Sequence, residues 1–378
     1  MKHGPTEKKS LDEVAKLAGV SIATVYRVAS GNTSVSREVH KRVRDAAEKV
    51  GIGLDRKKKP NVLAFLLSNR GMLHPFHSQI LVGAEAVCTA RGWDMVFQLF
   101  RYDVAVPWKG LHLPRILQRR DIVRGAVLAG TNSPNLLELL DHRKIPFAVL
   151  GNNVLSDDRQ LPFDAVYSDD VRGAYEMTRY LQELQHHDIW FVGNNSEPWC
   201  ARCLAGYERA MKEVDIPARA STVESNNATE AGYLGTKSLL ARGEPVTAIL
   251  GSTDETAEGI YKALKERGLA IPDDVSVAGC NDTFGSRLAP PLTSIREFPE
   301  QLGRRMVELL LSRIEDPTLA PQQITIPTEL VKRESCAVCA TSGGTQNSRN
   351  IASTQNLQRI EGAGKAEGHS WAPKGITF

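Results

Sequence analysis

Apolar positions within residues 10–51 recur every three or four residues, which is the spacing of one face of a helix. Three such stretches follow one another, with apolar positions at Leu11, Val14, Ala15 and Leu17, then Val25 and Val28, then Val39, Val43, Ala46, Ala47 and Val50. Ser10 and Glu13 have capping-box spacing at the start of the first stretch, and Ser21 stands where the second helix would be capped. Because Gly19 is placed to end the first helix, the pattern predicts a helix-turn-helix arrangement.

The start of the second predicted helix is the segment that this arrangement would bring to DNA. A helix-turn-helix unit lays its second helix in the major groove, with the first residues against base edges, while basic residues of a third helix remain for water or phosphate. We therefore expect DNA contacts from Ser21, Ile22, Ala23, Thr24, Tyr26, Arg27 and Lys41. The alternative is a small helical bundle with no nucleic-acid role.

Beyond residue 60 the pattern changes to short apolar runs, each separated from the next by a segment able to form a helix. The runs cover residues 62–67, 93–100, 125–129 and 147–151, and the rhythm restarts with runs at 165–170, 189–194, 248–252 and 276–282. This alternation is typical of βαβ units and a parallel sheet. The fold class that it predicts is α/β, with two doubly wound lobes joined to a small all-α N-terminal domain.

The expected domain boundaries follow from these patterns. Residues 1–51 form the headpiece, residues 52–60 a short basic linker, and residues 61–335 the two-lobed core. Lobe 1 is expected at about 61–162 and 291–322, and lobe 2 at about 163–290 and 323–335. Residues 336–378 are rich in Gly, Ser, Asn and Gln without a sustained apolar period, which predicts a disordered tail.

Charge is divided unevenly along the chain. Residues 1–60 contain 14 lysines and arginines against 7 aspartates and glutamates, and the remainder contains 33 against 37. Phosphate neutralisation supplies most non-specific affinity for DNA, so a basic end on a mildly acidic body indicates one module for DNA and another for a different ligand.

Composition argues against a membrane protein and against a protein held together by disulfides. The chain of 378 residues is 42% hydrophobic, its first ten residues are charged, and no later run is long enough to span a bilayer. Six cysteines are too few for a disulfide scaffold of this size and fit a reducing cytosol. We therefore expect a cytoplasmic protein without a membrane partner.

Metal and catalytic motifs are weak. Two Cys-x-x-Cys pairs, at residues 200–203 and 336–339, have the ligand number of a structural zinc site but lie far apart in sequence. His74 and His77 lack an obvious third ligand, and surface turns explain them better. Neither a phosphate-cradling glycine loop nor a nucleophile motif is found. We expect no metal, no cofactor and no enzymatic activity.

Several segments resemble the LacI family of bacterial transcriptional repressors, from Leu11 to about Ser335. LDEVAKLAGVSIATVYRVASG resembles the family's opening signature, residues 35–51 its third helix, GLAIPDDVSVAGCND a late core segment, and ELVKRES its closing strand. The resemblance implies a homodimer and a periplasmic-binding-protein-like core of two lobes with crossed connections. It also implies a small effector, often a sugar, bound in the cleft between the lobes.

The sequence departs from the family pattern at the DNA-reading helix and at the linker. Tyr26 stands where the family usually has a serine, while Ile22 and Ala23 occupy the variable base-reading positions and suit thymine methyl groups. Arg27 would then carry the polar readout. Residues 52–60 lack the pattern of the family's hinge helix, so we expect little bending of the operator and no wedge at Leu54. The basic residues of this linker would act through phosphate or minor-groove electrostatics, and they are Arg56, Lys57, Lys58 and Lys59. The alternative is a merely solvated linker.

Candidate effector contacts come from the loops after the strands and from the same resemblance. Cys203 stands where related repressors place a ligand-clamping arginine, with Arg202 one residue earlier, and Asn281 replaces a common aspartate. The expected set is Asn69, Phe76, Asn152, Trp199, Arg202, Asn227, Thr253, Asp254 and Asn281. Each also has a structural interpretation: the two aromatics could be core residues, Asp254 could cap a helix, and the asparagines could be turn residues.

These observations predict a sequence-specific transcriptional repressor whose affinity for operator DNA is controlled by a sugar-like effector. A solute-binding protein of a transport system shares the two-lobed core, but the headpiece and the charged N-terminus argue against it. An enzyme acting on a sugar in the cleft would need a nucleophile or a carboxylate pair that the sequence does not identify.

Overall fold

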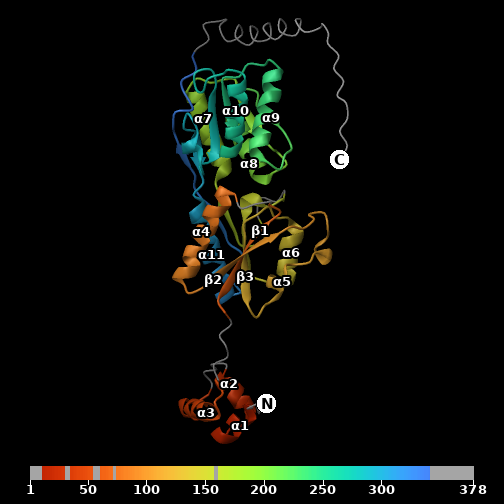
Figure 1. The fold of residues 1–378 in the computed structure, drawn as a ribbon, viewed down its shortest axis with the longest axis vertical. Coiled ribbons are helices and arrows are strands. Elements are labelled where there is room, and N and C mark those ends of the chain that lie inside the picture. Colours follow the sequence, from red (N-terminus) through yellow and green to blue (C-terminus); the bar gives the residue numbers. More distant parts are fainter. Residues whose placement is uncertain (1–10, 30–34, 54–59, 71–73, 157–160, 341–378) are drawn as a thin grey trace, which may run out of the picture.

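The computed structural model describes residues 11–29, 35–53, 60–70, 74–156 and 161–340. Three helices, α1 (Leu11–Ala18), α2 (Ile22–Ala29) and α3 (Arg37–Val50), form a headpiece that lies apart from the two lobes in Figure 1. Val14, Val25 and Val43 are fully buried at its centre. The Oγ of Ser36 accepts the N–H of Val39 at the start of α3.

The linker is only partly described. Ile52 still packs against the headpiece core, and its N–H donates to the carbonyl of Ala47 at 2.9 Å, so the headpiece extends beyond the predicted end at residue 51. Residues 54–59, which include Leu54 and the basic run, lie outside the described residues, as does Ser10 of the predicted capping box.

Lobe 1 is built on a six-stranded parallel sheet in the order β11-β5-β4-β3-β1-β2. The strands are β1 (Val62–Ser68), β2 (Asp94–Phe100), β3 (Val123–Leu128), β4 (Phe147–Leu150), β5 (Ala165–Ser168) and β11 (Gln323–Ile326). Every residue of β1 is buried, because helices cover both faces of a parallel sheet. Leu63 and Phe65 pack towards α4 and α11, and Ala64 and Leu66 belong to the core that α5 and α6 cover.

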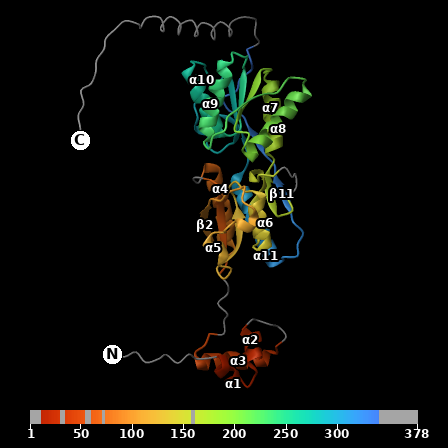
Figure 2. The ribbon, with the colours of Figure 1, turned by 90° about the vertical axis from the view of Figure 1, so that its right-hand side faces the viewer.

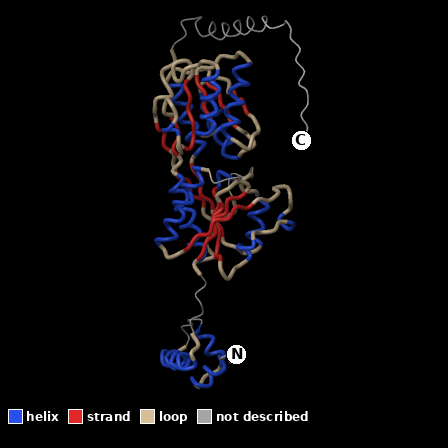
Figure 3. Tube along the Cα trace, in the orientation of Figure 1, coloured by secondary structure: helices blue, strands red, loops and turns tan. Residues whose placement is uncertain are grey.

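Lobe 2 repeats this plan in the order β12-β10-β9-β8-β6-β7, with β12 antiparallel to β10. Its strands are β6 (Ile189–Gly193), β7 (Arg219–Thr222), β8 (Ala248–Gly251), β9 (Ser276–Asn281), β10 (Thr293–Arg296) and β12 (Glu329–Val331). Figure 2 shows α7 and α8 on one side of this lobe and α9 and α10 on the other. The prediction of two doubly wound α/β lobes is confirmed, and Figure 3 shows the two groups of strands.

Helices fill the connections between the strands. Those of lobe 1 are α4 (Pro75–Ala90), α5 (Arg115–Gln118), α6 (Pro134–His142) and α11 (Pro299–Glu315), with short 3-10 turns η1 (Trp108–Gly110) and η2 (Gly151–Asn153). Those of lobe 2 are α7 (Asp170–Glu183), α8 (Pro198–Glu213), α9 (Ala228–Ala241) and α10 (Asp254–Glu266), with η3 (Gly285–Arg287). Within the described residues, none of these helices is long and apolar enough to cross a membrane.

The chain crosses between the lobes three times, and each crossing lies later than the sequence predicted. The expected boundaries at 162/163, 290/291 and 322/323 move to the ends of β5, β10 and β11. Residues 165–168 begin no new lobe: they pair with β4 and complete the first sheet. The strands of both sheets have the same short apolar pattern, so this pattern alone could not show which sheet each strand joins.

The first residues of the predicted tail belong to lobe 2. Residues 336–340 are held against lobe 2: Sγ of Cys336 donates to the carbonyl of Val277, and the N–H of Ala337 donates to Oγ of Ser276. The N–H of Cys339 donates to the carbonyl of Leu184 at 2.8 Å. Two of these partners are backbone carbonyls, which composition cannot reveal. The rest of the predicted tail, residues 341–378, lies outside the described residues.

We predict that Gly83→Ala destabilises lobe 1 by about 1–3 kcal/mol, the usual cost of overpacking a tight interface. A Cβ at Gly83 would stand 2.0 Å from the carbonyl oxygen of Glu300, where α4 meets α11. Urea unfolding measures the effect. The control is Ala90→Ser, which adds one heavy atom at an exposed position of the same helix and should change stability by less than about 0.5 kcal/mol. Equal stabilities for both variants would contradict the close contact.

Candidate functional site

A cavity of about 70 Å³ lies where the carboxyl ends of the two sheets face each other. Its lining combines two aromatic side chains with amide, hydroxyl, imidazole, guanidinium and carboxyl groups from both lobes. Those residues are Arg70, His74, Phe76, His77, Asn152, Asn153, Trp199, Cys203, Ala228, Ser252, Thr253, Glu255, Asn281 and Glu297. Parallel strands end at one edge of their sheet, so the loops that follow them meet there.

Two ion pairs join the lobes across this cavity. His74, the N-cap residue of α4, places Nε2 at 2.8 Å from Oε1 of Glu255 on α10. Arg70, after β1, places Nη2 at 3.9 Å from Oε2 of Glu197, which precedes α8. Burial raises the pKa of the Glu255 carboxyl, but the hydrogen bond and charge of His74 outweigh burial and leave that pKa below its usual value.

The aromatic residues lie on opposite sides of the cavity. Phe76 belongs to α4 of lobe 1 and contacts His77 edge-on, with ring centroids 5.6 Å apart. Trp199 belongs to α8 of lobe 2, and its ring lies under the Arg70 guanidinium, 4.2 Å from Cζ. Flat rings beside amide and carboxyl groups form a surface suited to the apolar face and hydroxyl edge of a sugar.

His77 is buried, so its interpretation as a surface turn residue is wrong. Its Nε2 lies 3.3 Å from Nδ2 of Asn153, and its Nδ1 has no hydrogen-bond partner. Burial, together with the charge of Arg70, lowers the pKa of His77 well below its usual value. The ring is therefore neutral at pH 7, and its Nδ1 is available to a ligand.

Glu297 lies in the second crossover, between β10 and α11, and its carboxyl group is buried. The Oγ of Ser168, at the end of β5, donates to its Oε2 at 2.6 Å. Burial, reinforced by the charge of Asp170, raises the pKa of Glu297 to about 8. The group thus carries a proton at neutral pH and adds no charge to the cavity.

Five of the nine predicted effector contacts line the cavity: Phe76, Asn152, Trp199, Thr253 and Asn281. The carboxylate of Asp254 has other partners instead. It accepts from Oγ of Ser294 at 2.6 Å and from the N–H of Gly285 at 2.8 Å, and it is completely buried. Burial raises its pKa to about 6. This geometry gives Asp254 a structural role in joining α10 to the loop after β9.

The other three predicted contacts also have structural partners. Arg202 forms an ion pair with Asp170, with 2.8 Å between Nη2 and Oδ1. Cys203, the next residue on the same helix, lines the cavity, whereas the side chain of Arg202 does not. Asn69 has a left-handed backbone and accepts the N–H of Tyr102 through Oδ1. Asn227 caps α9 by accepting the N–H of Glu230.

Sequence reasoning missed several ionisable lining residues, above all Arg70, Glu255 and Glu297. Glu255 directly follows the predicted Asp254, and Arg70 directly follows the predicted Asn69. In both cases the sequence indicated the residue next to the one that lines the cavity. The side chain that turns into the cavity depends on the local helix and turn geometry. Glu297 lies in a crossover whose position the periodicity did not define.

The start of α2 has the exposure that DNA reading needs. Ile22 and Tyr26 are 39% and 53% exposed, whereas Val25 and Val28 on the opposite face are buried. Ala23, Arg27 and Lys41 are exposed as well. Ser21 acts as a cap, since its Oγ accepts the N–H of Thr24 at 3.2 Å.

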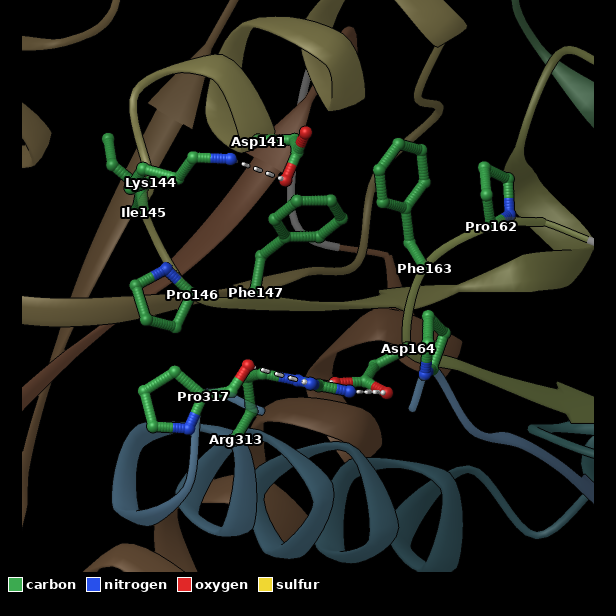
Figure 4. Close-up of a pocket in the computed structure, with 11 residues that line it drawn as sticks. Asp141, Lys144, Ile145, Pro146, Phe147, Pro162, Phe163, Asp164, Arg313 and Pro317 are labelled. Atoms are coloured by element: carbon green, nitrogen blue, oxygen red, sulfur yellow. Dashed lines mark hydrogen bonds and ion pairs between the residues drawn. The ribbon is translucent and has the colours of Figure 1, made fainter. Parts of the chain in front are cut away.

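A second hollow, of about 260 Å³, opens at the opposite edge of lobe 1, beside Phe147 and Phe163 (Figure 4). Arg313 and Asp164 form its polar floor, and all five N–H groups of Arg313 donate, to the Asp164 carboxylate and to the carbonyls of residues 317, 319 and 320. These groups hold the loop after α11. The hollow is larger than the interlobe cavity, but its ion pair is already satisfied internally.

Comparisons with known proteins agree with this architecture. The sequence profile described as bacterial regulatory proteins, lacI family, matches residues 10–51, and the profile for a periplasmic binding protein-like domain matches residues 178–336. The HTH-type transcriptional repressor PurR of Actinobacillus pleuropneumoniae serotype 3 (strain JL03) is 30% identical over 86% of this chain and 98% of its own length. The HTH-type transcriptional regulator DegA of Bacillus subtilis (strain 168) is 28% identical over 87% and 98%.

Solved structures show the same arrangement. A complex of the transcriptional regulator CelR with cellobiose has a TM-score of 0.64 and 25% identity, covering 86% of this chain and 99% of its own. The Lac repressor dimer bound to operator and the anti-inducer ONPF also has a TM-score of 0.64 and 25% identity, covering 87% and 99%.

The fold and the two sites together define a transcriptional regulator with a helix-turn-helix headpiece and a periplasmic-binding-protein-like core. This chain belongs to the lacI family of bacterial regulatory proteins. The resemblance noted in the sequence is therefore confirmed, and the relatives named above are regulators rather than enzymes.

We predict that Glu297→Gln becomes more stable relative to the wild type as the pH rises from 5 to 8. Between its usual pKa and about 8, Glu297 holds a proton in the folded state only, so the wild type loses unfolding free energy with rising pH, whereas glutamine does not titrate. The gain should be on the order of 1–4 kcal/mol, because each pKa unit of difference between the two states corresponds to about 1.4 kcal/mol.

Urea unfolding at several pH values measures this effect. Glu300→Gln, at an exposed position three residues later, is the matched control for the loss of one carboxyl group. A stability difference between Glu297→Gln and the wild type that stays constant from pH 5 to pH 8 would show that Glu297 is ionised in the folded protein.

Proposed function

We propose that this protein is a homodimeric repressor that releases or takes up its operator when a small sugar-like molecule binds between its lobes. The observation that carries this function is the presence, on one chain, of an exposed helix-turn-helix surface and of an interlobe cavity with unsatisfied polar groups. Two headpieces of a dimer would occupy two half-sites. The cytoplasm, where such a regulator meets DNA, is its proposed location.

The DNA-reading residues are proposed from the geometry of the headpiece. Ile22 and Ala23 present apolar surface at the start of α2, and Arg27 presents the guanidinium that can bind a guanine edge through two hydrogen bonds. Tyr26 adds an exposed phenol for phosphate contact, and Lys41 adds charge from α3. Ser21 and Thr24 complete the surface that α2 would turn to the groove.

We predict that Arg27→Ala weakens binding to the preferred DNA site by about 1–3 kcal/mol and relaxes the preference at one base pair. Lys41→Ala should weaken binding to all sequences alike, because a phosphate contact carries no sequence information. Binding titrations on a site selected from a random DNA library, and on scrambled DNA of the same length, measure both effects. An equal loss of binding free energy on the two DNAs for Arg27→Ala would contradict the assignment of Arg27 as a base-reading residue.

The effector site is proposed from the cavity. Structures related to this chain contain cellobiose or ribose. Phe76 and Trp199 provide apolar faces, and Thr253 and Asn281 provide a hydroxyl and an amide for ligand hydroxyl groups. Asn152 supports the cavity wall instead, because both its amide nitrogen and its amide oxygen are hydrogen-bonded to Ser168. A ligand bound here contacts both lobes, so it would favour one relative placement of the lobes and thereby alter the spacing of the two headpieces.

We predict that Trp199→Ala abolishes the rise in unfolding temperature that an effector causes, because it removes an aromatic wall of the cavity. A thermal-shift panel of pentoses, hexoses, disaccharides and sugar acids provides the ligands. Arg202→Ala is the control: this residue belongs to the same helix but pairs with Asp170. Each variant is compared with its own ligand-free protein. Loss of the shift in Arg202→Ala together with its retention in Trp199→Ala would contradict the proposed site.

A further inference from the structure

Arg70 is a largely buried arginine whose guanidinium lacks a close partner. Its side chain is 23% exposed, and its Nε is buried without a hydrogen-bond partner. The Oε2 of Glu197, with which it forms an ion pair, lies 3.9 Å from Nη2, beyond the length of a hydrogen bond. The Trp199 ring covers one side of the guanidinium, with its centroid 4.2 Å from Cζ.

Other sheltered arginines of the core are paired differently. The Nε and Nη2 of Arg313 bind both oxygens of Asp164, and Nε of Arg202 donates to both oxygens of Asp170. Arg333 places Nη2 at 2.7 Å from Oδ1 of Asp282. An arginine keeps its charge in a protein, so a buried guanidinium without an acceptor is costly. Arg70 differs from these arginines in its pairing, and it lines the effector cavity.

Glu197 balances the charge of Arg70 without a close hydrogen bond, and the other ionisable groups of the cavity donate or accept elsewhere. Glu255 is engaged by His74 at 2.8 Å, and the buried Glu297 holds its proton at pH 7 because burial raises its pKa to about 8. His77 is neutral at pH 7, as burial lowers its pKa. The cavity therefore presents a guanidinium with a vacant donor, held only loosely by Glu197, and, beside it, an amide and a hydroxyl that suit a polyol.

We propose that the natural effector is a sugar acid whose carboxylate binds Arg70, displacing Glu197, while its hydroxyl groups bind Thr253 and Asn281. This inference rests on the proposed function, because it concerns the same cleft. A carboxylate accepts two parallel hydrogen bonds from one guanidinium. A phosphate monoester would bring up to two negative charges towards a single arginine, with the carboxylate of Glu255 lining the same cavity.

Matched pairs of ligands test the proposal. Isothermal titration of the full chain compares glucose with glucuronate, galactose with galacturonate, and mannitol with mannonate, because each pair differs chiefly by one carboxylate. Glucose 6-phosphate is the phosphate probe. We expect at least one acid to bind about ten- to hundredfold tighter than its neutral partner, as charge-assisted hydrogen bonds would give.

Two variants locate the carboxylate. Arg70→Gln should remove the preference for the acid within that pair, while Glu197→Gln should increase it several-fold, because Glu197 repels the incoming anion and competes for Arg70. A purely structural role for Arg70 would not produce this opposite pair of changes. Because Arg70→Gln removes a poorly paired buried charge, the unfolding temperature of this variant without ligand should not fall. If that temperature does fall, the ligand preference of Glu197→Gln still tests the proposal independently.

The proposal is overturned if neutral ligands bind as tightly as their acids, if glucose 6-phosphate binds while every acid fails, or if none of these compounds binds. It is also overturned if Glu197→Gln weakens the preference for the acid. The proposed function is judged separately, by DNA binding of the Arg27 and Lys41 variants and by the thermal-shift panel. Neutral sugars that bind and shift DNA affinity would therefore refute the sugar acid and leave the regulator intact.

Discussion

The cleft depends on one geometric constraint: all strands of a parallel sheet end at the same edge, and in this protein two such edges face each other. Loops after β1, β4, β8 and β9 therefore deliver side chains to one cavity although they are far apart in sequence. The three crossovers keep the edges opposed. The hydrogen bond from Ser168 to Glu297 joins the first crossover to the second, and Oγ1 of Thr328 in the third donates to the carbonyl of Asp169.

Buried polar atoms without hydrogen-bond partners indicate a binding role only where they line the cavity, because other such atoms lie outside it, on Ser68, Asn69, Asn132 and His186. Asp254 and Arg313 have several internal partners each, so both serve the fold although each lies near a hollow. Arg70 and His77 retain buried nitrogen atoms without partners, which costs stability unless a ligand supplies them. Such local conflicts are expected at binding sites, where a fold gives up stability for recognition.

The strand β1 links the two proposed activities. It begins at Val62, just beyond the linker from the headpiece, and ends at Ser68, two residues before Arg70. It spans about 23 Å at the usual rise per residue, and it is buried along its whole length between helices. A ligand bound at Arg70 would therefore lie near one end of a buried strand whose opposite end leads, through the linker, to the DNA-binding unit.

The sequence alone determined the helix-turn-helix unit, the two α/β lobes and their opposed loops, because apolar periodicity records which faces are buried. It also indicated Trp199, Phe76, Asn152, Thr253 and Asn281 as lining residues, through their positions after strands and a family resemblance. Only the tertiary structure decided which sheet residues 165–168 join, and that Arg70 and Glu255 line the cavity while their neighbours Asn69 and Asp254 have internal partners. The physical reason is that adjacent residues in a turn or helix point in different directions. Their partners come from distant segments that no local pattern encodes.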